Sequence, residues 1–326
     1  MAELRVRRES WPIRGGFAIS RGRKTQADVI VAEVIDGGAA GRGECVPYAR
    51  YGETLEGVAK RIEELGPKIA AGMSRDLLQE ALPRGAARNA MDCALWDLEA
   101  KRGGRRVWQL AGLTEPRPLE TAYTLSLGPA DGMREAAGRE KARPLLKLKL
   151  AGAGDLERVE AVRAAAPASR LIVDANEGWS VEDYEFLAPR LADLGVELIE
   201  QPFPAGEDAV LSRLDRPVPV CADESCHDAD TLHALKGLYD AVNIKLDKTG
   251  GLTGALALRG EAGKLGFSVM VGCMVATSLA MAPAMLVAQG ADWVDLDGPL
   301  LLARDREAGL RYEGSMVHPP EAELWG

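Results

Sequence analysis

Three carboxylates and two lysines follow short apolar runs at nearly regular intervals in the middle of the chain. In chain order they are Lys149, Asp174, Glu200, Asp223 and Lys245. Neighbours in this series are 22 to 26 residues apart, which is enough for a strand, a loop and a helix. In a parallel βα barrel the carboxyl ends of all strands lie at one rim, where such enzymes carry their catalytic residues. The spacing therefore predicts one site that is built from consecutive strands.

The three carboxylates indicate a metal site. On adjacent strands, Asp174, Glu200 and Asp223 could converge on one hard cation, with water and substrate oxygens completing the coordination. This donor set suits Mg²⁺ better than Zn²⁺, and none of the three histidines lies in these segments. The alternative is that each carboxylate caps a helix or forms a surface salt bridge by itself, but three on consecutive strands argue against it. We therefore expect one Mg²⁺ per subunit.

The lysines could be acid/base catalysts. Lys149 and Lys245 flank the carboxylates in strand order, so in a closed barrel they can stand on opposite sides of a substrate. Lys147 shares the face of Lys149, because side chains alternate along a strand. A lysine near Mg²⁺ and a second lysine has a lowered pKa and can act as a base near neutral pH. We expect Lys147 to support Lys149 in this way, the alternative being a solvated lysine at a strand end.

This set of groups predicts proton abstraction next to a carboxylate. If the metal binds a substrate carboxylate, the two lysines face the α-carbon, and the cation stabilises the enediolate that forms.

The elements that must position these residues form an α/β fold. Residues 117–307 are expected to form a (β/α)8-type, modified TIM barrel, because strands and helices alternate there. Helical patterns at 156–165, 181–194 and 253–265 fall between strands. The expected strands are 121–127, 144–150, 171–176, 197–202, 218–225, 241–248, 268–274 and 293–299.

Residues 1–116 are expected to form an N-terminal α+β capping domain, on which residues 308–326 pack back. It has a small antiparallel sheet followed by helices. A basic loop at 15–25 carries Arg21, Arg23 and Lys24. The expected strands are 4–8, 28–34 and 42–45, and the expected helices are 54–71, 86–101 and 106–112.

Length and composition exclude several classes of partner. At 326 residues the chain can form one large barrel and a smaller domain. Its net charge of −9 argues against nucleic acid or an anionic membrane as a partner. Five cysteines without C-x-x-C spacing and a charged start to the chain indicate reduced thiols in a cytoplasmic protein.

One uncharged stretch is long enough to suggest a membrane span. The 27 residues between Lys264 and Asp292 carry no charge. Gly, Ser, Pro and Gln interrupt them, and the pattern fits a buried strand at 267–274 and a packed helix at 279–288. We therefore expect no contact with a membrane.

The motifs resemble those of a known family. The segments L-K-L-K-L, V-D-A-N, I-E-Q-P, A-D-E-S and N-I-K-L-D-K-T-G-G occur in that order, as in the muconate-lactonizing subgroup of the enolase superfamily. A-A-R-N-A-M-D-C-A-L-W-D-L at 86–98 and V-D-L-D-G-P at 294–299 extend the resemblance over essentially the whole chain. It implies that Asp174, Glu200 and Asp223 bind Mg²⁺ and that Lys149 and Lys245 are the acid/base pair. Lys248, the second lysine of K-L-D-K, lies past the catalytic one in the motif, and we interpret it as structural.

Within the subgroup, the chain most resembles dipeptide epimerases of the L-Ala-D/L-Glu type. Their D-x-D on the eighth strand matches Asp295 and Asp297, which could hold the free α-ammonium of a dipeptide or could cap the strand end. The basic loop could receive the acidic side chain of the second residue through Arg23 or Lys24, or could be solvated. The family commonly has an arginine where Lys24 stands.

The resemblance implies an isomerase that epimerises small dipeptides, by analogy in murein-peptide recycling. The alternatives within the subgroup are an N-acylamino acid racemase, an o-succinylbenzoate synthase or a cycloisomerase, none of which needs a carboxylate pair for a substrate ammonium. A barrel that binds a small acid without turnover is a further alternative, but it would not need two lysines. Homo-oligomer formation stays open.

Overall fold

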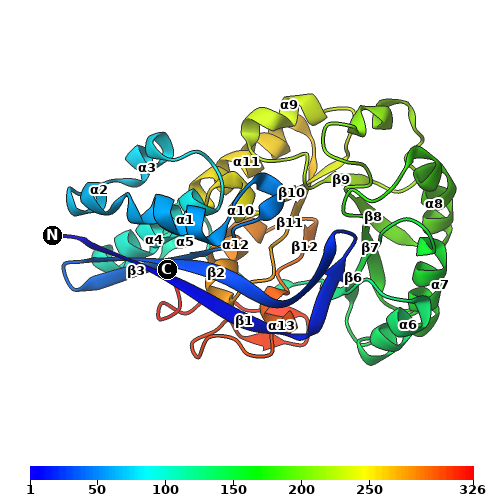
Figure 1. Cartoon of the computed structure of the whole chain (residues 1–326), viewed down its shortest axis with the longest axis horizontal. Coiled ribbons are helices and arrows are strands. Elements are labelled where there is room, and N and C mark those ends of the chain that lie inside the picture. The colour runs from blue at the N-terminus through cyan, green and yellow to red at the C-terminus, as the bar shows by residue number, and fades with distance from the viewer.

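The computed structural model describes all 326 residues, arranged as an N-terminal domain beside a barrel (Figure 1). The N-terminal sheet is antiparallel, in the order β1-β2-β3. Its strands are β1 (Glu3–Ile19), β2 (Gly22–Asp36) and β3 (Ala39–Cys45). Four helices follow them, α1 (Leu55–Glu63), α2 (Gly66–Ala70), α3 (Arg75–Ala81) and α4 (Ala86–Gly103). Gly41 and Gly43 let β3 lie directly against α4, because a Cβ on either would overlap the α4 backbone.

The predicted basic loop at 15–25 is wrong, because this segment continues the β1–β2 hairpin. The two strands pair again from Phe17 to Ile19 around a two-residue turn, Ser20 and Arg21. Gly15 and Gly16 have positive φ and form the irregularity between the two paired stretches. In Figure 1 the hairpin leaves its domain and ends in front of the barrel.

One helix prediction for this domain is wrong, and one helix was missed. The expected helix at 54–71 is two helices, α1 and α2, and the break falls just before Gly66 and Pro67. Proline at the second position of α2 fits a helix start, where its missing N–H is not needed. Helix α3 was not predicted at all, whereas α4 lies where a helix was expected. The short α5 (Val107–Leu110) lies within the expected 106–112.

Eight parallel strands in sequential order confirm the predicted barrel. They are β5 (Tyr123–Leu125), β6 (Leu145–Lys149), β7 (Arg170–Asp174), β8 (Val196–Glu200), β9 (Val220–Ala222), β10 (Ala241–Ile244), β11 (Ser268–Val271) and β12 (Trp293–Val294). The first and last strands meet where the backbone N–H of Ala122 donates to the carbonyl of Val294, at 2.8 Å. The barrel therefore closes as a ring, although β12 is very short.

The connections after the strands show where the barrel is modified. The α-helices are α6 (Ala130–Arg139), α7 (Asp155–Ala165), α8 (Val181–Asp193), α9 (Leu232–Leu235), α10 (Leu246–Thr249), α11 (Leu252–Leu265), α12 (Ser278–Ala288) and α13 (Gly298–Leu301). A 3-10 helix, η2 (Asp208–Arg213), stands where β8 would be followed by an α-helix. The remaining 3-10 helices are η1 (Ala49–Tyr51) and η3 (Ala229–Thr231). The long uncharged stretch forms β11 and α12, and no helix has both the length and the apolar run needed to cross a bilayer.

Several strands end earlier than predicted, so that charged residues expected within strands lie just beyond them. Strand β10 ends before Lys245, which is the N-cap of α10. Strand β12 ends before Asp295 and Asp297, which lie in the turn that leads into α13. These side chains therefore stand on the rim of the barrel and not within its ladder.

An apolar plug closes the lower end of the barrel. Buried side chains from successive strands meet there and exclude water. The plug consists of Ala122, Leu145, Ile172, Leu198, Cys221, Ala241 and Met270. Because these residues fill the interior below the charged groups, the site is open only at the rim.

The end of the chain contacts both parts of the molecule. Strands β13 (Tyr312–Glu313) and β14 (Met316–Val317) form a small sheet with β4 (Leu119–Glu120). The guanidinium of Arg42 donates to the Glu323 and Leu324 carbonyls, and the Trp325 indole donates to the Cys93 carbonyl at 3.0 Å. The last residues are thereby held against the N-terminal domain.

Candidate active site

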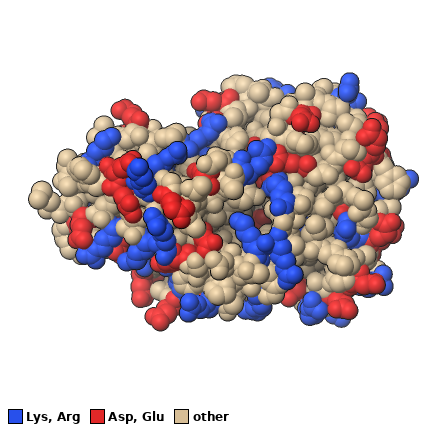
Figure 2. Space-filling view, in the orientation of Figure 1, with Lys and Arg blue, Asp and Glu red and all other residues tan.

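A cavity of about 390 Å³ lies between the barrel rim and the N-terminal domain. The β1–β2 hairpin and the segment that carries Tyr48 and Tyr51 form one wall, and the carboxyl ends of the barrel strands form the other. Figure 2 shows basic side chains gathered around a hollow at the centre of this face. The basic residues that line the cavity from the N-terminal domain are Arg21, Arg23, Lys24 and Arg50.

Lys147 lies at the centre of a buried charge cluster below the cavity. Its Nζ is 2.6 Å from Glu200 Oε2, 2.7 Å from Asp295 Oδ2 and 3.4 Å from Asp174 Oδ2. Burial by itself would lower the pKa of Lys147, but the three carboxylates outweigh it and raise the pKa well above its ordinary value. The alternative of a solvated strand-end lysine is therefore wrong.

Lys149 follows on the same strand and faces the cavity. Its Nζ is 2.5 Å from Asp174 Oδ2 and 5.9 Å from the centre of the Phe17 ring on the hairpin. The other oxygen of Asp174 accepts the backbone N–H of Asn176 at 2.9 Å. Burial would raise the pKa of Asp174, but Lys149 and Lys147 lower it to about 2. The carboxylate therefore stays ionised.

Lys245 lies across the barrel from Lys149, because β6 and β10 are four strands apart in a ring of eight. Its Nζ is 2.6 Å from Asp223 Oδ2 and 4.0 Å from Glu200 Oε1. Burial would lower the pKa of Lys245, but these two carboxylates raise it well above the ordinary value. The lowered pKa expected for a base concerns a lysine beside a bound cation, which would also occupy these carboxylates.

Asp174, Glu200 and Asp223 are brought together at the ends of β7, β8 and β9 and are all buried. They do not form a ready cluster of metal ligands in this arrangement, because each is turned towards a lysine. Their chemistry nevertheless fits a hard cation, since all three are oxygen donors. Burial and the neighbouring Asp174 raise the pKa of Glu200, a crowding of negative charge that a cation would relieve.

Asp295 and Asp297 both line the cavity, but their surroundings differ. Asp295 uses Oδ2 for Lys147, while its Oδ1 is buried without a hydrogen-bond partner. Asp297 accepts the backbone N–H of Thr124 on Oδ2 at 2.6 Å. Burial and the nearby Asp295 raise the pKa of Asp297 to about 7. The pair is therefore suited to receive a positively charged group.

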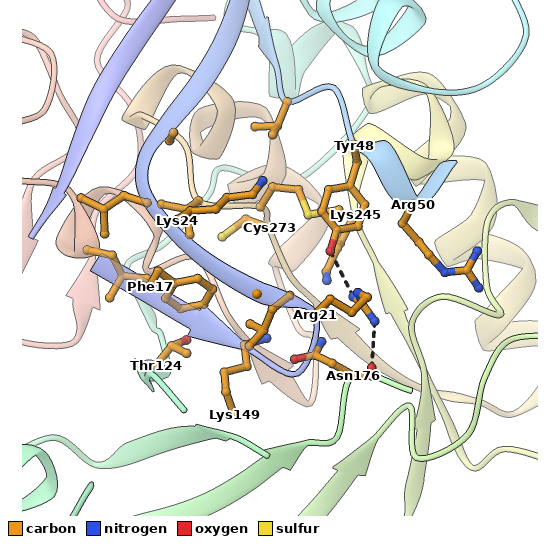
Figure 3. Close-up of a pocket in the computed structure, with 18 of the residues that line it drawn as sticks. Phe17, Arg21, Lys24, Tyr48, Arg50, Thr124, Lys149, Asn176, Lys245 and Cys273 are labelled. Carbon is orange, nitrogen blue, oxygen red and sulfur yellow. Dashed lines mark hydrogen bonds between the residues drawn. The ribbon is translucent and has the colours of Figure 1, made fainter. Parts of the chain in front are cut away.

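The two basic residues predicted to bind the substrate side chain differ in their contacts. Lys24 reaches into the cavity and lies over the Tyr48 ring, with its Nζ 5.4 Å from the ring centre (Figure 3). Burial lowers the pKa of Lys24. Arg23 instead donates to the Gly15 carbonyl at 2.7 Å and folds over the glycine irregularity of the hairpin. Lys24 is thus the cation that remains available to a ligand.

The sequence placed Arg21 in a basic loop that could receive the substrate side chain, but it did not predict the contacts of Arg21 or a role for Glu224. At the hairpin tip, Arg21 donates to the Tyr48 hydroxyl at 3.0 Å and to the Asn176 carbonyl at 2.8 Å (Figure 3). It also donates to Glu224 Oε1 at 2.6 Å. Burial, together with the Asp223 and Asp174 charges, raises the pKa of Glu224 to about 7. The only signals in the sequence were the place of Arg21 in the basic segment and of Glu224 beside Asp223.

Fold and site together define an enzyme with a capped barrel, in which two lysines lie on opposite sides of a cluster of carboxylates. Residues 132–323 match the family described as enolase C-terminal domain-like. Residues 1–112 match the mandelate racemase/muconate lactonizing enzyme N-terminal domain. The chain belongs to this family of the enolase superfamily, which confirms the resemblance seen in its motifs.

Two curated relatives are isomerases of similar length. The L-Ala-D/L-Glu epimerase of Escherichia coli K12 is 46% identical over 98% of this chain and 100% of its own length. The N-acetyl-D-glutamate racemase of a Pseudoalteromonas species is 46% identical over 91% of this chain and 95% of its own length. The two are equally similar to this chain, so identity alone does not choose between their substrates.

Solved structures show the same fold with small molecules bound. An enolase family member from Agrobacterium tumefaciens, with bound sodium and L-Ala-L-Glu, is 54% identical and has a TM-score of 0.98, with all of both chains covered. A dipeptide epimerase from Enterococcus faecalis, complexed with Mg and L-Leu-L-Tyr, is 28% identical and has a TM-score of 0.90, covering 98% of this chain and 97% of its own.

Proposed function

We propose that this enzyme epimerises dipeptides of the L-Ala-D/L-Glu type by moving the α-proton of the C-terminal residue. The observation that carries the proposal is the placement of Lys149 and Lys245 on opposite sides of one site, each against a different carboxylate. Epimerisation requires removal of a proton from one face and its return to the other. A site for binding alone would need no acid/base group on either face.

Asp174, Glu200 and Asp223 would bind one Mg²⁺, and some of their ion pairs with the lysines would then be broken. When bound, the ion would supply positive charge to the substrate carboxylate as negative charge develops on it. Mg²⁺ accepts carboxylate oxygens together with substrate oxygens and water, and related dipeptide epimerases with Mg bound support the choice. One lysine of the pair, in its neutral form, would accept the α-proton, and the other, in its charged form, would return a proton to the opposite face.

The remaining charged residues fit a dipeptide with an acidic second residue. Asp295 and Asp297 would hold its α-ammonium, which the catalytic groups cannot reach because it lies beyond the amide. Lys24 would pair with its side-chain carboxylate. The basic rim seen in Figure 2 would also draw an anionic substrate towards a protein of net charge −9.

Racemisation of N-acetylglutamate is the second candidate. It is favoured by the equally similar N-acetyl-D-glutamate racemase and by the raised pKa of Asp297. A protonated Asp297 could meet a neutral acyl group by hydrogen bonding without burying an unpaired charge. By contrast, a dipeptide ammonium would favour ionised Asp297, since an opposite charge stabilises the charged form.

Exchange of the α-proton in D₂O tests both candidates. The enzyme is incubated with Mg²⁺ and, separately, with L-Ala-L-Glu, L-Ala-D-Glu or N-acetyl-D-glutamate, and mass gain and epimer ratio are followed. We expect rapid exchange and epimerisation of the two dipeptides, with loss of both after chelation by EDTA. Faster turnover of N-acetylglutamate would select the second candidate, and full activity without metal would refute the role of the cation. With the expected substrate, the enzyme would fit recycling of murein peptides in the cytoplasm.

A further inference from the structure

Lys248 is a buried lysine that the proposed reaction does not use. Its side chain is fully buried and lies in α10, three residues after Lys245. A lysine ammonium has three N–H donors, and here it has three acceptors. They are Asp223 Oδ1 at 2.7 Å, the Asp223 carbonyl at 2.5 Å and the Asn243 carbonyl at 2.9 Å. No donor of Lys248 is left for a ligand, and the residue does not line the cavity.

Two of these three hydrogen bonds act on Asp223. Lys248 holds Oδ1 of the carboxylate, while Oδ2 lies 2.6 Å from Lys245 Nζ. Rotation of an aspartate carboxylate about its last bond has only broad preferences, so without a partner on Oδ1 the group could turn. With Lys248 in place, one oxygen is fixed and the other is presented to the site.

The third hydrogen bond connects Lys248 with Glu200. Lys248 donates to the Asn243 carbonyl, and the Asn243 side-chain amide donates to Glu200 Oε1 at 2.7 Å. Gly272 lies against the same amide, and a Cβ there would come within 2.7 Å of Asn243 Oδ1. The asparagine therefore has little room to move, and a single buried frame holds Glu200 and Asp223.

We propose that Lys248 is the positioning residue that fixes the orientation of Asp223, and through it the place of Lys245. Lys248 keeps one oxygen of Asp223 occupied, so that only Oδ2 is available to the cation and to Lys245. This inference rests on the proposed function, because it assigns Lys248 to the half of the reaction that Lys245 serves. Lys149 depends on Asp174 and lies on the other side of the barrel, so Lys248 has no direct effect on it.

The test compares Lys248→Met with Lys101→Met, a matched control in α4. Lys101 also pairs with a buried aspartate, with its Nζ 2.8 Å from Asp97 Oδ2, but it does not line the cavity. The first readout is Mn²⁺ affinity without substrate, measured by electron paramagnetic resonance. The second is α-proton exchange in D₂O for each epimer of L-Ala-Glu, the Lys245 side being the epimer whose exchange Lys245→Ala abolishes.

We expect Lys248→Met to weaken Mn²⁺ binding at least tenfold and to slow exchange on the Lys245 side at least tenfold more than on the Lys149 side. Lys101→Met should change neither. Unchanged Mn²⁺ affinity, or equal slowing on both sides, would overturn the proposal. Lys248→Gln, which keeps a neutral donor, should show the same selectivity with smaller losses. If neither variant of Lys248 folds, the lysine supports the fold and the proposal is wrong.

Failure of the proposed function would give a different result. If the wild-type protein exchanges no dipeptide proton, the reaction assigned above is wrong. The Mn²⁺ titration still decides whether Lys248 positions Asp223, because it needs no substrate.

Discussion

Replacing Asp297 by asparagine changes the charge of the cavity while keeping its shape. Asp297 accepts the Thr124 backbone N–H through Oδ2, and an asparagine side-chain oxygen can accept the same bond. The variant should therefore fold normally. What it loses is the negative charge that would face the α-ammonium of a dipeptide.

The size of the effect follows from the hydrogen bond that is lost. A hydrogen bond to a charged group contributes about 1.5–3 kcal/mol. Its loss should lower kcat/KM for L-Ala-L-Glu roughly tenfold to a hundredfold, because about 1.4 kcal/mol corresponds to a factor of ten. An N-acetylated amino acid has no ammonium, so its turnover should stay the same or improve.

The pH dependence gives a second measure of the same interaction. The pKa of Asp297 is raised to about 7 by burial and by Asp295, so the carboxyl is largely protonated below that pH and ionised above it. The pH dependence of kcat/KM reports the pKa values of groups in the free enzyme. The wild-type kcat/KM for the dipeptide should therefore rise as pH increases through about 7. Asp297→Asn should lack this rise.

The assay is steady-state epimerisation of L-Ala-L-Glu and N-acetylglutamate between pH 5.5 and 8.5. Asp292→Asn is a suitable control, because Asp292 also accepts the backbone N–H of a neighbouring strand but is exposed at the opposite end of β12. It should behave as the wild type does. Equal losses on both substrates in Asp297→Asn would show that Asp297 supports the barrel and does not recognise the ammonium.

Two further substitutions test the substrate side chain and the contact between the two domains. Lys24→Met should lower the ratio of kcat/KM for L-Ala-L-Glu to kcat/KM for a neutral dipeptide such as L-Ala-L-Met at least tenfold. Arg23→Met should change this ratio little. Equal effects of the two substitutions in parallel kinetic assays would refute the assignment of Lys24. Asp247 accepts hydrogen bonds from the Val46 N–H and the Asn89 amide, and burial raises its pKa to about 7. The native state therefore binds more protons than the unfolded state. As a result, the free energy of unfolding falls as the pH rises from about 4 to 7. Asp247→Asn, which cannot ionise, should gain a few kcal/mol over the wild type in urea unfolding at pH 8 and little at pH 5; a gain that does not depend on pH would contradict this.

The sequence was sufficient to predict which barrel residues share a site. Lys149, Asp174 and Glu200 end consecutive parallel strands, and parallel strands of one sheet end at the same rim. Alternation along β6 also places Lys147 and Lys149 on the same face. These relations depend on local periodicity and on a repeating unit, both of which can be read from one sequence.

The wall formed by the N-terminal domain could not be predicted in the same way. Gly15 and Gly16 looked like the start of a loop, yet they form an irregularity within a hairpin that continues over the cavity. The partners of Arg21 come from elsewhere in the chain, and Glu224 is 203 residues away. Such pairs are fixed by how the domains pack, for which the sequence gives no local signal.

The central claim is that two lysines act on opposite faces of one α-carbon, and single-epimer exchange tests it most directly. Lys149→Ala and Lys245→Ala are each incubated in D₂O with Mg²⁺ and with pure L-Ala-L-Glu or pure L-Ala-D-Glu, and deuterium at the α-carbon is followed by proton NMR. Both variants should lose epimerisation, and each should still exchange one epimer, a different one in each variant. If both variants exchange the same epimer, or if either one epimerises at the wild-type rate, the two-lysine mechanism is contradicted.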